Sequence, residues 1–134
     1  SRTEGFGGEV KKRIMLGSFV LSEAYYDAYF TKAQQVRKLI CNKMAQLFEE
    51  YDFLMMPTSP VVAWSIDKKP NNPLESYMAD IYTVLANLAG LPSISIPAGN
   101  NSAKMPFGIQ VIGKKNDDQK VLAFSKIISA ITIA

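Results

Sequence analysis

The sequence contains no histidine and only one cysteine, Cys41. Without histidine, the chain has no imidazole for acid–base catalysis or for metal ligation. Clusters of Cys, Asp or Glu at metal-ligand spacing are also missing, so we expect no metal site. A single cysteine forms no internal disulfide, which is typical of a reducing compartment. We interpret Cys41 as an inert thiol at the core or its boundary, because it falls within a helical apolar stripe.

Long hydrophobic runs are missing as well. No apolar stretch approaches the roughly 18 residues of a membrane span, and no signal peptide is visible. The net charge is only +3, with Lys and Arg spread along the chain, so composition predicts no nucleic-acid-binding surface and no membrane association. Because the chain opens on Ser1-Arg2-Thr3 without methionine, we interpret it as a piece of a longer protein.

The 134 residues suffice for one domain, and 48% hydrophobic with 20% charged residues is typical of a soluble globular protein. Periodicity predicts a single α/β domain over residues 1–134, in which helices cover a small mixed β-sheet. We expect helices over 9–21, 23–50, 77–89 and 119–131, strands over 52–56, 93–96 and 106–113, and a loop over 58–74 anchored by Trp64.

Particular residues give these elements their expected details. Ser22 is a candidate N-cap for the long helix, and Gly17 indicates close packing of the first helix against another backbone. The strand 52–56 is apolar on both faces, which favours a central position in a covered sheet. Residues 106–113 are expected to form a hairpin with the strand before them.

The region 77–99 organises the chain. Its helix has an apolar face, ends at Gly90 as a left-handed C-cap, and is followed by a strand that Pro97 and Gly99 end. Asp80 lies in the first turn of this helix, among residues whose apolar character predicts burial. The last helix is expected to bury one apolar face, made of Val121, Leu122, Phe124, Ile127, Ile128 and Ile131.

Several stretches together resemble the C-terminal third of the amidase signature family. They are GFGGEVKKRIMLG (5–17), LSEAYYDAYFTKAQQVRKLI (21–40), YDFLMMPTSP (51–60), NPL (72–74), YMADIYTVLANLAGLPSISIP (77–97) and MPFGIQVIGK (105–114). NLAGLPSISIP and PFGIQVIG are similar across the family. RIMLG, YYDAYFTKAQQVR and the Asp of MADIYT resemble the branch formed by the A subunits of glutamyl-tRNA(Gln) amidotransferases. Two departures are Ala98, where the family usually has Cys, and Asn71-Asn72-Pro73 in place of DDP.

The resemblance implies a glutaminase-type amidase. In that branch a serine attacks the side-chain amide of glutamine, and the released ammonia converts Glu-tRNA(Gln) to Gln-tRNA(Gln) in a partner subunit that uses ATP and Mg. The resemblance also implies partner subunits B and C, tRNA contacted mainly through a partner, and a cytoplasmic or organellar-matrix location. The family's Ser–cis-Ser–Lys triad belongs to a Gly/Ser-rich stretch that is absent here. We therefore expect no catalytic residue and no cofactor in this chain, and no activity of the chain alone.

Substrate binding is what the resemblance leaves to this chain. Free glutamine carries an α-carboxylate and an α-ammonium group, which an Arg and an Asp can bind. Arg13 of RIMLG and Asp80 of MADIYT match the positions that do this in the amidotransferase branch. From the residues alone, Arg13 is also explained as a solvated helix face, and Asp80 as a charge favoured by the helix macrodipole.

Two other functions stay open. The chain could be part of an amidase that acts on a simple amide, which would need neither Arg13 nor Asp80. It could also be a non-catalytic interaction domain that docks through the helix 23–50. Because the strand 52–56 is apolar on both faces, the chain by itself is also expected to self-associate.

Overall fold

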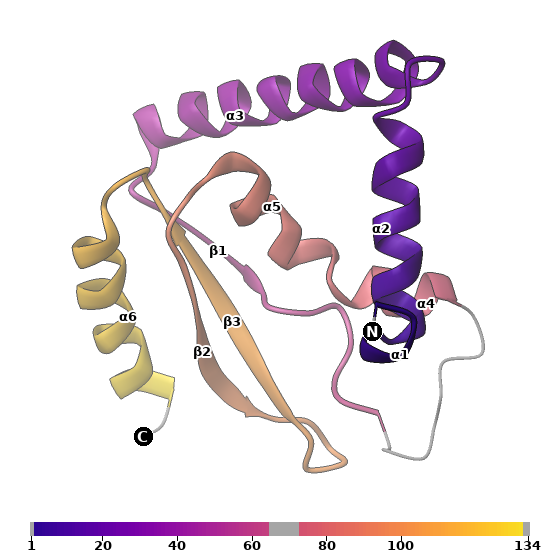
Figure 1. Cartoon of the computed structure of the whole chain (residues 1–134). Helices are drawn as coiled ribbons and strands as arrows, with labels where there is room; N and C mark the ends of the chain where they lie inside the picture. The colour runs from indigo at the N-terminus through magenta and orange to yellow at the C-terminus, as the bar shows by residue number, and fades with distance from the viewer. Residues whose placement is uncertain (1, 65–72, 133–134) are drawn as a thin grey trace. The chain divides into compact units, whose positions relative to one another are not determined.

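The computed structural model describes residues 2–64 and 73–132. These residues fall into two compact units, Ser1–Leu39 and Ile40–Ala134, which are described one after the other. That residues 1–134 form a single domain stays a prediction. Figure 1 shows the elements of each unit.

The first unit is helical. It contains α1 (Arg2–Gly5), α2 (Gly8–Val20), the π-helix η1 (Tyr26–Thr31) and the start of α3 (Lys32–Glu50). The predicted helix 9–21 is confirmed, but a Cβ on Gly17 would meet no atom within 4 Å among the described residues. Within the first unit, Gly17 therefore does not pack closely against another backbone.

The predicted helix 23–50 is wrong at its beginning. Ser22 does not cap a new helix; its hydroxyl donates to the Phe19 carbonyl at the end of α2, at 2.7 Å. A turn and η1 follow before α3 begins. The rings of Phe19, Tyr25 and Tyr29 pack together, with centroids 4.3 to 6.1 Å apart, so aromatic contacts between α2 and η1 decide the backbone path.

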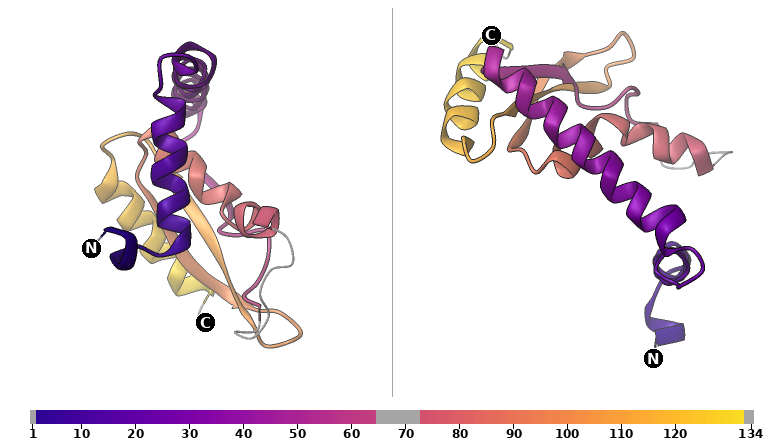
Figure 2. Two further views of the ribbon diagram at one scale, coloured as in Figure 1. Left: turned by 45° about the vertical axis from the view of Figure 1, so that its right-hand side comes forward. Right: turned by 90° about the horizontal axis from the view of Figure 1, so that it is seen from above.

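The second unit contains the sheet. Its elements are the rest of α3, then β1 (Phe53–Pro57), α4 (Pro73–Ala79), α5 (Ile81–Ala89), β2 (Ser93–Asn100), β3 (Pro106–Gly113) and α6 (Asp118–Thr132). The three strands have the order β1-β3-β2 and pair antiparallel throughout, where a mixed sheet was expected. Figure 2 shows the sheet in two further views. The hairpin of β2 with β3 is confirmed.

Two strand details differ from the prediction. β1 forms an edge of the described sheet and β3 its centre, because the alternation of β3 places Val111 and Ile112 on opposite faces, both fully buried. β2 does not end at Pro97; it runs on to Asn100 across an irregularity between Pro97 and Gly99. The irregularity accommodates the proline, which cannot donate to the ladder.

Helices pack on both faces of this sheet (Figure 1). On one face, Leu54 and Met56 of β1 join Ile112, Ala86 of α5, and Met44 and Phe48 of α3 in the core. On the other face, Phe53 stacks on Phe124 of α6 with ring centroids 4.3 Å apart and planes 4° apart. The apolar character of β1 on both faces is thereby explained by α3 and α5 on one face and α6 on the other.

The helix predicted from Tyr77 is interrupted at Asp80, which separates α4 from α5. The expected end at Gly90 is confirmed: Gly90 has φ 67° and ψ 46°, and the Leu91 N–H donates to the Ala86 carbonyl at 3.0 Å. Cys41, in α3, is half-buried, and its Sγ lies 3.7 Å from the Leu88 carbonyl oxygen of α5.

The predicted buried face of the last helix is only partly correct. Val121 and Ser125 are buried, whereas Leu122, Ile127 and Ile131 are 59 to 69% exposed. α6 faces the sheet with Phe124 and with two smaller residues, Val121 and Ser125, and Gly113 lets Val121 approach the backbone of β3. At the start of α6, a hydrogen bond from Lys120 to Asp117 at 2.9 Å raises the pKa of Lys120 above its usual value.

Candidate substrate-binding site

Asp80 occupies the junction between α4 and α5. Its backbone, with φ −95° and ψ 0°, lies at the N-cap position of α5, yet its side chain makes no capping hydrogen bond there. Its carbonyl accepts the N–H groups of Thr83 and Val84 at 3.1 and 3.2 Å, and the Thr83 hydroxyl at 2.9 Å. The chain is therefore held through its backbone, and the carboxylate is not used to cap α5.

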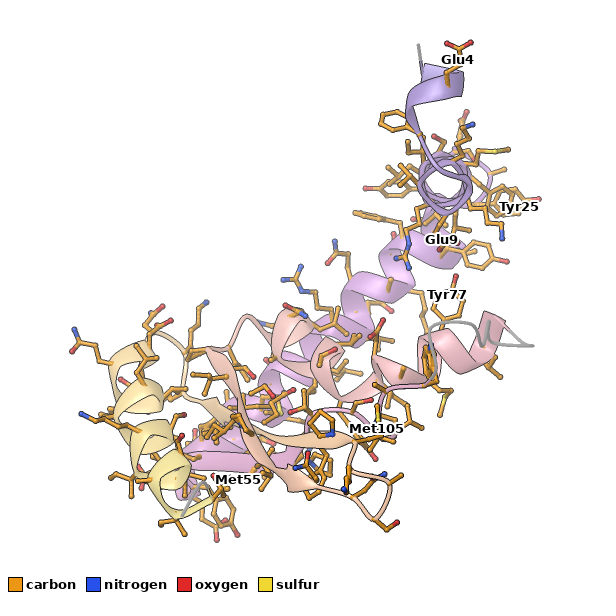
Figure 3. The ribbon with its side chains drawn as sticks, turned by 90° about the horizontal axis from the view of Figure 1, so that it is seen from below. Glu4, Glu9, Tyr25, Met55, Tyr77 and Met105 are labelled. Carbon is orange, nitrogen blue, oxygen red and sulfur yellow. The ribbon has the colours of Figure 1, made fainter. Side chains whose placement is uncertain are left out.

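The surroundings of Asp80 are apolar but exposed, so the predicted burial is wrong. Asp80 itself is exposed, and Tyr77, Met78, Ile81 and Val84 are 43 to 56% exposed. Figure 3 shows Tyr77 on α4. The apolar pattern was correctly seen, but α5 reaches the core through Leu85, Ala86 and Ala89, on its other side. A carboxylate thus lies on an exposed apolar surface, which is an unusual setting for a merely solvated charge.

Arg13 lies on α2, in the first unit. Its Nε donates to the Glu9 carboxylate at 3.2 Å, four residues earlier on the same helix, and 69% of its side chain is exposed. Glu9 is labelled in Figure 3. An exposed i,i+4 pair of this kind contributes little to stability, so it also binds the guanidinium only weakly. The guanidinium can exchange Glu9 for a ligand carboxylate at small cost.

Arg13 and Asp80 belong to different compact units. Their convergence on one ligand stays a prediction.

A hollow of about 630 Å³ lies beside the α4–α5 junction, in the second unit. Its walls come from residues 58–64 after β1, from the end of α4, and from the β2–β3 hairpin. The lining residues are Thr58, Ser59, Val61, Val62, Ala63, Trp64, Ala79, Ser95, Pro97, Pro106, Phe107 and Gly108. None of them is charged; the polar side-chain groups of this hollow are the hydroxyls of Thr58, Ser59 and Ser95 and the indole N–H of Trp64. Ala79, which directly precedes Asp80, connects the hollow to the candidate site.

Two of these hydroxyls contact each other. The oxygens of Thr58 and Ser95 lie 2.7 Å apart, over Gly108. A Cβ on Gly108 would lie 2.8 Å from the Ser95 oxygen and 3.0 Å from the Thr58 oxygen, so glycine is needed to make room for the pair. Because a hydroxyl needs an adjacent base to act as a nucleophile and the lining residues include none, this pair is suited to hydrogen bonding rather than to covalent catalysis.

Sequence reasoning treated the residues of this hollow as turn and strand positions. Ser95 does lie in β2 as expected, and Trp64 lies in the hollow wall while 44% exposed. Residues 65–72 of the predicted loop, including the departure at Asn71-Asn72, lie outside the described residues. The predicted end of the loop at residue 74 is wrong, because α4 already begins at Pro73. The PTSP motif at 57–60 is the sequence feature that could have indicated the hollow. Its last three residues, Thr58, Ser59 and Pro60, follow the end of a strand and carry two hydroxyls and a rigid ring.

Among the described residues, no group of three or more Cys, Asp or Glu is placed to hold a metal ion. A search of the helices in the same part of the chain found none long and apolar enough to cross a membrane.

Comparison with known proteins decides the family. The profile of the Amidase family matches residues 1–122. The chain belongs to the amidase family. The A subunit of a glutamyl-tRNA(Gln) amidotransferase from Alkaliphilus metalliredigens is 53% identical over 122 residues, which cover 91% of this chain and 25% of that protein. The chain therefore spans about a quarter of the length of the curated relatives it matches.

Solved structures agree on the fold. The crystal structure of the glutamyl-tRNA(Gln) amidotransferase A subunit from Thermotoga maritima is 47% identical, with a TM-score of 0.69, over 90% of this chain and 26% of that chain. A crystal structure described as an amidase matches 97% of this chain and 30% of its own, with a TM-score of 0.77; at 23% identity it supports the fold alone. The chain is thus an α/β fragment of the amidase-signature fold, as expected.

Proposed function

We propose that this chain is the glutamine-binding C-terminal part of the A subunit of a tRNA-dependent amidotransferase. The observation that carries the proposal is the 53% identity to such a protein over 122 residues. In this proposal the serine nucleophile is supplied by sequence outside the chain, and the ammonia it releases amidates glutamate on tRNA(Gln) in a partner subunit. The partner uses ATP and Mg, and the location is the cytoplasm or an organellar matrix.

The proposed roles follow from the chemistry of free glutamine. The Arg13 guanidinium binds the α-carboxylate, because its planar fork offers two parallel hydrogen bonds that a lysine cannot reproduce. The Asp80 carboxylate binds the α-ammonium group. Its freedom from capping supports this role, because the carboxylate oxygens are not committed to α5. A ligand that covers the exposed apolar residues beside Asp80 would exclude water there and strengthen the ion pair. A simple-amide hydrolase would have no use for either charge.

The test uses a chimera in which this chain replaces the matching segment of the Thermotoga maritima protein. We expect the chimera to release ammonia from glutamine. Arg13→Ala and Asp80→Asn each leave a ligand charge unpaired, which costs about 2–5 kcal/mol in kcat/KM for glutamine. That corresponds to a loss of roughly 30-fold to several thousand-fold.

Two matched variants serve as controls. Lys12→Ala removes the neighbouring cation, and Asp118→Asn removes an exposed carboxylate at the start of a different helix, α6. Both should keep kcat/KM within about two-fold of the unsubstituted chimera, because surface charges away from the ligand contribute little. Equal kcat/KM for the site variants and the controls would remove the assignment of Arg13 and Asp80. Hydrolysis of a simple amide but not of glutamine would favour the other amidase function.

A further inference from the structure

Ser59, in the loop after β1, reaches the α4–α5 junction from a distant part of the sequence. Its hydroxyl donates to the Ala79 carbonyl at 3.1 Å, and the bond is partly buried. The same oxygen accepts the N–H of Val61 at 3.4 Å. Because one partner accepts and the other donates, the hydroxyl has a defined orientation.

The carbonyl that Ser59 binds belongs to the peptide group joining Ala79 to Asp80. A peptide group is planar, so fixing its oxygen also fixes the direction of the Asp80 N–H and restricts the position of the Asp80 Cα. This N–H donates to the Tyr77 carbonyl at a long 3.3 Å. With φ −95° and ψ 0°, the backbone of Asp80 departs from ideal α-helical geometry between the two helices, and its bond to α4 is of the i→i−3 type.

The other hydrogen bonds at this junction are local. The Asp80 carbonyl is held by Thr83 and Val84 of α5, and the Asp80 N–H by Tyr77 of α4. Ser59, in the loop after β1, connects the junction to a distant part of the sequence through the Ala79 carbonyl. Just inside α5, Gln110 of β3 makes a second, longer connection by donating to the Tyr82 carbonyl at 3.5 Å. The Ser59–Ala79 hydrogen bond also links the position of Asp80 to the hollow, because Ser59 and Ala79 both line its wall.

We propose that Ser59 is a positioning residue that orients Asp80 toward its ligand; this inference rests on the proposed function. Ser59 does not touch the ligand. It holds the Ala79–Asp80 peptide so that the carboxylate is in place before the ammonium group arrives, which lowers the cost of ordering the junction on binding. Without it, glutamine binding weakens while the chemical step, performed by other residues, is unchanged.

The experiment is steady-state kinetics of Ser59→Ala in the same chimera. We expect KM for glutamine to rise about 3- to 10-fold, as for the loss of one neutral hydrogen bond, with kcat within two-fold. Ser59→Thr keeps the hydroxyl and should restore KM. Ser22→Ala also removes a serine hydroxyl that donates to a carbonyl, but far from Asp80 in sequence, and should leave both constants unchanged.

The double variant Ser59→Ala/Asp80→Asn separates positioning from general stability. If Ser59 acts through Asp80, its removal adds nothing once Asp80 is neutralised. An additive effect, a fall in kcat with unchanged KM, or a failure of Ser59→Thr to restore KM would overturn the proposal. These outcomes indicate partial unfolding or an unrelated role.

Failure of the proposed function is distinguishable from failure of this inference. A folded chimera without glutaminase activity, or an Asp80→Asn variant with normal KM, overturns the proposed function and this inference with it. A normal KM in Ser59→Ala beside a raised KM in Asp80→Asn overturns only the role of Ser59.

If the chimera does not fold, amide hydrogen exchange of the 134-residue chain tests the proposal instead. Ser59→Ala should then speed exchange at Asp80 by about 3-fold or more, since the loss of one neutral hydrogen bond loosens the junction, and equal exchange would overturn the proposal.

Discussion

At the residue scale, Gly113 is a position where α6 packs tightly against β3. A Cβ added there would collide with Cγ2 of Val121, and it would also lie 3.8 Å from Cδ1 of Phe53. Val121 is 2% exposed and β-branched, so it has no alternative rotamer to adopt at low cost. The packing of α6 on β3 therefore depends on the absence of a single methyl group.

We predict that Gly113→Ala destabilises the chain by about 1–3 kcal/mol, because the surrounding core is already full. Urea unfolding followed by circular dichroism measures the change. Gly17→Ala is the matched control, since nothing lies within 4 Å of its Cβ position, and it should stabilise α2 by up to about 1 kcal/mol. Similar unfolding midpoints for the two variants would contradict this account of the α6 contact.

Of the two candidate site residues, Asp80 was accessible from the residue pattern itself, whereas Arg13 was assigned through the family resemblance. Asp80 was singled out as a carboxylate in an apolar segment, and the structure places it at a helix junction. The hydroxyl of Ser59 was not singled out, because serine in a Pro-rich segment is typical of any turn. Its proposed positioning role depends on its contact with Ala79, which lies twenty residues further along the chain.

At the element scale, α6 docks through its Phe124 ring as well as through Val121. Phe124 stacks on Phe53 of β1, which couples the last helix to the edge strand. Helical periodicity predicted a wide apolar face for α6, yet Leu122 is 59% exposed. Periodicity identifies apolar positions but not which of them meets a neighbour.

A double-mutant cycle tests the stacking. We expect Phe53→Leu and Phe124→Leu to be coupled by about 0.5–1.5 kcal/mol in unfolding free energy, beyond the loss of buried area. Leu122→Ala on the same helix should change stability by less than about 0.5 kcal/mol, as is usual for an exposed side chain. A coupling near zero, or a large effect of Leu122→Ala, would mean that α6 packs in another way.

At the scale of the whole molecule, apolar residues remain at the surface of the second unit. Met55 on β1, labelled in Figure 3, is 46% exposed, and Trp64, Met78 and Ile81 are 44 to 48% exposed. The outer edges of β1 and β2 have no strand partner among the described residues. Since the chain spans about a quarter of the length of its relatives, we infer that further sequence covers these surfaces in a full-length protein.

We predict that the 134-residue chain alone releases no ammonia from glutamine and forms oligomers as its concentration rises. The physical reasons are the missing nucleophile and the exposed apolar surface with open strand edges. A glutaminase assay and light scattering after size exclusion measure the two properties. A monodisperse monomer over a wide concentration range, or glutaminase activity of the chain, would contradict the interpretation as a fragment.

The sequence by itself determined those features of the backbone that local sterics control. The left-handed turn at Gly90, the strand 106–113 and the start of α6 near Asp118 depend on neighbours in the chain, and all were predicted. The tertiary structure alone decided that β3 is central, that Asp80 is exposed between two helices, and that Ser59 holds the peptide before it. These features depend on which distant segments pair. Pairing is set by how the surfaces of those segments fit together, and the periodicity of a single segment carries no information about that fit.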